Sequence, residues 1–118
     1  LDYHSMPSKI CNIIPDSPKV DFCLGDLFSQ SCPPKYTEFL QQQLKEKGYM
    51  VTVNIPYSGA FTTFNYCQPR KKIYTLQLEL NRGLYANEKS LTKNDNFQRV
   101  SADATASICE LAKKILDF

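Results

Sequence analysis

The stretch LQLELNRGLY, residues 76–85, opens on strictly alternating apolar and polar side chains. A period of two predicts a β-strand, here over residues 72–80, because successive side chains of a strand point to opposite faces. The leucines would face a core, and Gln77 and Glu79 would share the other face. A carboxylate in that position either points into a cleft, where it could serve as a general base, or lies on the solvent-facing side of an edge strand.

Two helices are predicted around this strand. The first begins after a Ser31 cap and stops at Gly48, and the second begins at a Ser101 cap. Their apolar positions recur at helical spacing: Tyr36, Phe39, Leu40 and Leu44 in the first helix, and Ala104, Ile108, Leu111 and Ile115 in the second. Residues 49–55 alternate as a strand, residues 1–4 look like the end of another, and residues 5–31, 57–70 and 83–96 are expected to be loops.

Strands separated by helices predict an α/β layered sandwich with a mostly parallel sheet. The length of 118 residues favours a single domain over residues 1–118. The chain opens on Leu1 instead of a methionine, in what looks like the end of a strand. We therefore expect a fragment or a processed chain, with an N-terminal segment missing.

Composition argues against two classes of partner. The net charge is only +2, and the one basic cluster, Arg70-Lys71-Lys72, lies in an expected loop, so nucleic-acid binding is not predicted. No window approaches the ~20 continuous apolar residues of a membrane span.

The five cysteines are odd in number and form no CxxC pair. This pattern favours free thiols and a cytoplasmic protein.

Three further groups could carry chemistry. His4, the only histidine, follows an expected strand and is either a zinc ligand, a general base or a structural histidine. Arg82 could hold a substrate carboxylate through a bidentate pair, or form a surface salt bridge. The turn containing Ser58 and Gly59 could let the backbone approach a ligand, or be a plain turn.

Five stretches, taken in order, resemble the N-formylglutamate amidohydrolases. They are LDYHSMP (residues 1–7), DFCLG (21–25), Ser31-Cys32, NIPYSGAFTT (54–63) and LQLELNRGLY (76–85). The last stretch is the most specific of the five. The resemblance covers nearly the whole chain, which is similar to the C-terminal half of the family's domain.

The resemblance implies a partial hydrolase fold, phosphorylase/hydrolase-like and similar to the zinc carboxypeptidases. It further implies a zinc-dependent amidohydrolase that cleaves a non-peptide C–N bond in an N-formyl or N-acyl amino acid. His4 matches the family's later metal ligand, and Glu79 matches its general base. Ser58, Gly59, Thr63 and Arg82 are the predicted substrate contacts.

Two departures from the family pattern shape the prediction. The family's early histidine–glutamate metal pair has no match, because His4 is the only histidine. The remaining zinc ligands are expected from a segment outside this chain; the alternative is an inactive fragment or binding module that keeps the fold without the metal. Phe64 stands where the family carries an arginine, which widens the expected substrate to other N-acyl amino acids and small amides.

Overall fold

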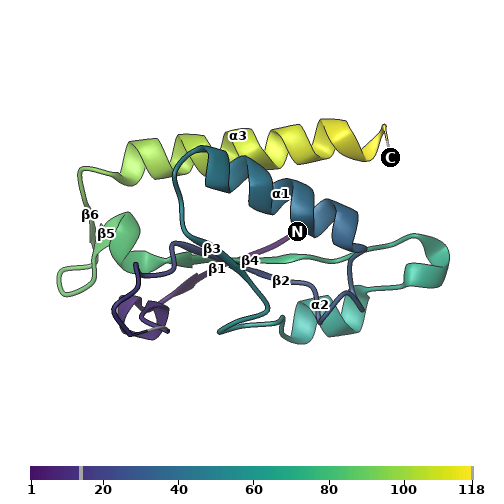
Figure 1. Ribbon diagram of the computed structural model, residues 1–118, viewed down its shortest axis with the longest axis horizontal. Helices are drawn as coiled ribbons and strands as arrows, with labels where there is room; N and C mark the ends of the chain where they lie inside the picture. Colours follow the sequence, from purple (N-terminus) through teal and green to yellow (C-terminus); the bar gives the residue numbers. More distant parts are fainter. Residues whose placement is uncertain (14, 118) are drawn as a thin grey trace.

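The computed structural model describes residues 1–13 and 15–117, which form a four-stranded sheet with two long helices on one face (Figure 1). The strands are β1 (Asp2–Met6), β2 (Phe22–Gly25), β3 (Val51–Val53) and β4 (Gln77–Asn81), and they lie in the order β1-β4-β2-β3. β1 is parallel to β4 and β2 is parallel to β3, whereas β2 and β4 are antiparallel. The predicted α/β fold with a mostly parallel sheet is therefore confirmed.

Helices α1 (Pro34–Glu46) and α3 (Phe97–Ile115) contact each other above the sheet, and the short helix α2 (Phe61–Tyr66) lies on the other side (Figure 1). Single 3₁₀ turns and a small hairpin complete the described chain: η1 (Ser8–Cys11), η2 (Pro69–Lys71), η3 (Arg82–Leu84), β5 (Ala86–Asn87) and β6 (Thr92–Lys93). Within the described residues, no helix is long and apolar enough to cross a membrane.

The main core lies between the sheet and the two long helices. The predicted leucine face of β4 is confirmed: Leu76, Leu78 and Leu80 are all buried in it. Leu40 and Leu44 of α1 are fully buried against them, which the helical spacing also predicted. Burying a leucine side chain contributes about 1.5–3 kcal/mol, so this contact fixes which face of β4 turns away from the helices.

Two elements lie where loops were predicted. Strand β2 falls within residues 5–31, and all four of its residues are buried. A strand covered on both faces shows no alternation, so its sequence lacks the signal of a half-buried strand. Helix α2 falls within residues 57–70, and the hairpin of β5 and β6 falls within residues 83–96. The three loop predictions were therefore wrong in these segments.

Several boundaries also differ from the prediction. Strand β4 begins at Gln77, five residues later than predicted, and the first predicted residue, Lys72, is left-handed with φ 59°. Strand β3 ends at Val53 because Asn54 has φ 63°. Strand β1 extends to Met6, beyond the expected strand end at residue 4. A left-handed residue cannot continue a strand, so Asn54 ends β3 and Lys72 cannot be part of β4.

The predicted helix caps were wrong, while the predicted stop at Gly48 is confirmed by its φ of 93°. The Ser31 hydroxyl donates to the carbonyl of Thr75 at 2.9 Å and does not cap α1. Helix α3 starts at Phe97, whose ring packs edge-on against Tyr85 with centroids 6.0 Å apart, so Ser101 lies inside the helix. At the other end of α3, the predicted core residue Ile115 is 47% exposed.

Candidate functional site

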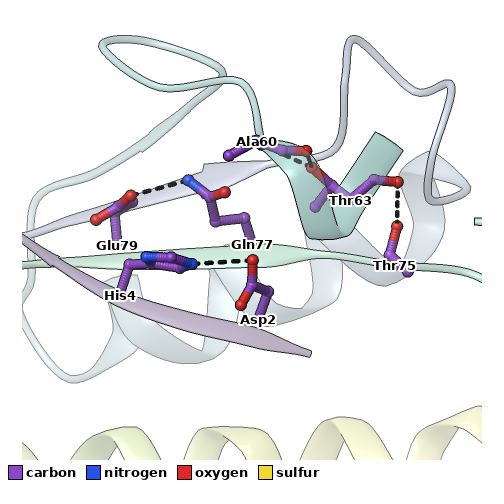
Figure 2. A network of polar contacts seen from close by, with 7 residues as sticks. All are labelled: Asp2, His4, Ala60, Thr63, Thr75, Gln77 and Glu79. Atoms are coloured by element: carbon purple, nitrogen blue, oxygen red, sulfur yellow. Dashed lines mark hydrogen bonds and ion pairs between the residues drawn. The ribbon is translucent and has the colours of Figure 1, made fainter. Parts of the chain in front are cut away.

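Four polar side chains meet on the face of the sheet that turns away from α1 and α3. The parallel register places Asp2 of β1 opposite Gln77 of β4, and His4 opposite Glu79. Residues two apart in a strand share a face, so the four form a square that projects toward the α2 side of the sheet (Figure 2). The sequence put Gln77 and Glu79 on one face; the register adds Asp2 and His4 to it.

Glu79 is buried, with only 7% of its surface exposed. Strand β4 lies between β1 and β2, so the solvent-facing edge-strand interpretation of its alternation is wrong. Gln77 donates from Nε2 to Glu79 Oε1 at 2.9 Å. Burial raises the pKa of Glu79; the nearby His4 lowers it and the Asp2 carboxylate raises it. The result is a carboxyl group that holds its proton more tightly than an exposed glutamate does.

His4 is the accessible member of the group. Its Nε2 lies 2.9 Å from Asp2 Oδ2, and 45% of its side chain is exposed. The position combines a fixed imidazole with an open approach, as a ligand-binding histidine requires. A carboxylate on one ring nitrogen leaves the other nitrogen to bind a metal ion.

The turn at Ser58 and Gly59 lies directly over the sheet beside this group. A side chain at Gly25, which pairs with Gln77, would place its Cβ only 2.6 Å from the carbonyl carbon of Ser58. The Leu27 N–H then donates to the Ser58 carbonyl at 2.8 Å and holds the turn in place. The backbone of this turn lies close to β2, whereas the approach predicted from the sequence was to a ligand. Substrate contacts from Ser58 and Gly59 stay a prediction.

Thr63 holds helix α2 together. It is fully buried, and its Oγ1 both donates to the Ala60 carbonyl and accepts from the Ala60 N–H, each at 2.8 Å (Figure 2). The Thr63 carbonyl accepts from Thr75 Oγ1 at 2.8 Å, which ties α2 to the chain entering β4. The Thr63 hydroxyl therefore has its hydrogen-bond partners within α2. The predicted contact between Thr63 and a substrate stays a prediction.

Arg82 is not brought together with Glu79. Its Nε and Nη2 each donate to Ser5 Oγ at 3.3 Å. Ser5 follows His4 along β1, so its side chain points to the opposite face of the strand. The described structure therefore places the guanidinium beside the sheet edge and away from the square of polar residues. Its predicted contact with a substrate carboxylate stays a prediction.

Asp26 is only 2% exposed and organises the turn after β2. Its Oδ1 accepts from the Ser29 N–H at 2.9 Å and from Asn54 Nδ2 at 2.8 Å, while its Oδ2 accepts from Thr37 Oγ1 at 2.9 Å. Three donors thus replace water around the carboxylate. The turn that Asp26 fixes carries Leu27, which holds Ser58, so Asp26 supports the site indirectly.

A zinc site needs three or more ligands from the protein. Among residues 1–13 and 15–117, no group of three or more His, Cys, Asp or Glu side chains could hold a metal ion. His4 supplies the only histidine nitrogen in the sequence. The described residues alone therefore do not make a complete zinc site.

The chain belongs to the N-formylglutamate amidohydrolase family, whose model matches residues 1–86. It is 36% identical over 88 residues to an N-formylglutamate deformylase of Pseudomonas putida, a match that covers 74% of this chain and 33% of that protein. The crystal structure of an N-formylglutamate amidohydrolase from Ralstonia eutropha JMP134 superposes on 98% of this chain with a TM-score of 0.86 and 30% identity. The resemblance seen in the sequence is confirmed.

The chain is shorter than both of these relatives. It spans one third of the deformylase and 43% of the solved amidohydrolase. The matched region includes β1 and β4, and hence all four residues of the polar square.

Proposed function

We propose that this chain carries part of the active site of an amidohydrolase that cleaves the amide C–N bond of N-formylglutamate or a related N-acyl amino acid. Family membership supports the reaction class. The single observation that carries the proposal is Glu79: a buried carboxyl group with a raised pKa, held by Gln77 on the same sheet face as His4. Glutamate side chains are rarely buried so deeply, and a buried carboxyl group with a shifted pKa marks a candidate functional site.

Glu79 acts as the general base in this proposal. Its carboxylate accepts a proton from a water molecule as the water oxygen attacks the carbonyl carbon of the amide. The same proton then passes to the amide nitrogen as the C–N bond breaks, which releases the carboxylic acid and the free amine. A raised pKa suits both halves of this cycle, because the group must take up the proton and then return it near neutral pH.

We also propose zinc as the cofactor, with His4 as the one ligand from these residues and the others from outside them. Zinc, when bound, would polarise the amide carbonyl and lower the pKa of a bound water. Asp2, 2.9 Å from His4 Nε2, would fix the orientation of the imidazole. All five cysteines are free, which supports the further proposal of a reducing, cytoplasmic location.

The test is formate release from N-formyl-L-glutamate by a zinc-supplemented protein that also contains the remaining zinc ligands, and by its Glu79→Gln variant. We expect kcat to fall by about 10²–10⁴-fold, since a positioned general base contributes about that factor. Zinc content should be unchanged in Glu79→Gln and reduced in His4→Ala. Glu38→Gln, an exposed glutamate on α1, is the matched control and should keep full activity.

Two results would contradict this proposal. Activity of Glu79→Gln within a few-fold of wild type would remove Glu79 from the base role. Binding of N-formyl-L-glutamate without hydrolysis, in the wild-type protein supplied with zinc, would favour a binding module instead. That second candidate is favoured by one observation, the lack of a three-ligand cluster among the described residues.

A further inference from the structure

Gln77 is the most deeply buried member of the polar square, and it carries a polar atom without a hydrogen-bond partner. Only 2% of its surface is exposed. Its Nε2 donates to Glu79, but its Oε1 is buried and accepts no hydrogen bond from the described residues. Leaving a buried acceptor unpaired costs about 1–3 kcal/mol, so such an atom calls for a donor that arrives from outside the chain.

The contacts around Gln77 fix which way its amide points. Glu79 offers only oxygen atoms when ionised, so the amide nitrogen, rather than the amide oxygen, must face it. Oε1 is therefore turned away from Glu79 and toward Ala60 (Figure 2). The turn at Ser58 lies over Gly25, the residue that pairs with Gln77 in β2. A donor that reaches Oε1 would lie next to the carboxyl group of Glu79, because the same amide donates to that group.

We propose that Gln77 has two roles: its Nε2 orients Glu79, and its Oε1 accepts the N–H of the scissile amide. This inference rests on the proposed amidohydrolase function. A secondary amide carries one N–H beside the carbonyl carbon that the water attacks, and that N–H is the donor the unpaired oxygen lacks. Gln77 thus selects amides over substrates without an N–H and places the departing nitrogen beside the group that returns the proton.

The first test measures the pKa of Glu79 by ¹³C NMR of its labelled carboxyl group. Gln77→Met keeps the volume of the side chain but removes the donor. A hydrogen bond to the ionised form lowers a carboxyl pKa, so its loss should raise the pKa of Glu79 above the wild-type value. Gln41→Met is the matched control, because Gln41 donates to the Val51 carbonyl on the far side of the sheet and should leave Glu79 unchanged.

The second test compares kcat/KM for N-formyl-L-glutamate and for its formate-ester analogue, in which oxygen replaces the amide nitrogen. Gln77→Met should lower kcat/KM for the amide about tenfold more than for the ester, the effect of one lost hydrogen bond. Gln77→Glu, which keeps an acceptor oxygen, should preserve the amide preference and still raise the pKa of Glu79. It also replaces the methionine variant if that variant does not fold.

Failure of this inference differs from failure of the proposed function. An unchanged pKa of Glu79 in Gln77→Met, or equal losses for amide and ester, would overturn the roles assigned to Gln77 while leaving the enzyme active. A wild-type protein that hydrolyses neither compound would overturn the proposed function. In that case the NMR titration still decides whether Gln77 controls the carboxyl group.

Discussion

The fit between the sheet and the turn above it can be tested by giving Gly25 a side chain. In Gly25→Ala the new Cβ would lie 2.6 Å from the Ser58 carbonyl carbon, 2.7 Å from the Gly59 nitrogen and 2.8 Å from the Ser58 oxygen. Ordinary contact begins at 3.4 Å, so the turn must retreat by 3.4 − 2.6, or about 0.8 Å. Backbone atoms cannot rotate aside as a flexible side chain can. The turn must therefore move as a unit.

Overpacking of this kind costs typically about 1–3 kcal/mol. We expect Gly25→Ala to lower the free energy of unfolding by that amount in urea, with an unchanged m-value, and to lower Tm by several degrees. Activity should fall further than stability explains, because the displaced turn carries Ser58 and Gly59. Gly83→Ala is the control: its Cβ meets side chains and no backbone, with Ser8 at 3.0 Å and Asn81 at 3.3 Å. A Gly25→Ala protein as stable as Gly83→Ala would refute the reasoning.

Two further predictions concern buried carboxyl groups. Because burial raises the pKa of Glu79, the folded chain holds that proton more tightly than the unfolded chain, and the resulting stability is lost as pH rises through the folded pKa. Glu79→Gln should therefore have a larger free energy of unfolding than wild type at about pH 7. This difference in stability should disappear by about pH 3, below the unfolded pKa. A difference that stays constant across pH in urea titrations would contradict this prediction. Asp26→Ala strips the acceptor from three donors and should cost about 3 kcal/mol or more in the same assay, whereas a loss under 1 kcal/mol would show that water replaces the carboxylate.

The sequence predicted the parts of the fold that follow a repeating pattern. The alternation in residues 76–80 identified the buried face of β4, and the spacing of Leu40 and Leu44 identified the core face of α1. Strand β2 was missed because it is buried on both sides and only four residues long. Helix α2 was missed because its FTTFNY sequence is rich in β-branched and aromatic residues, which have low helix propensity. Thr63 holds that helix through contacts no period reveals.

The site was predictable only where one strand contained it. Glu79 and Gln77 share a face of β4 by alternation alone. Their pairing with His4 and Asp2 depends on which residues of two distant segments lie in register, and a shift of one residue would turn both β1 side chains away. Arg82 was placed in the site because it follows β4 directly in the sequence. Its guanidinium instead donates to Ser5, whose side chain lies on the opposite face of β1.

The burial of β4 gives the strongest physical argument that the polar square is functional. All five residues of this strand are buried, although its sequence alternates as if one face met water. Covering Gln77 and Glu79 costs free energy that one hydrogen bond offsets only in part, because Gln77 Oε1 stays unpaired. Apolar residues of similar size would give a more stable strand. Such a conflict between the polarity of a residue and its burial is most often found at functional sites. The residues that lower the stability of β4 are therefore the ones that the proposed chemistry needs.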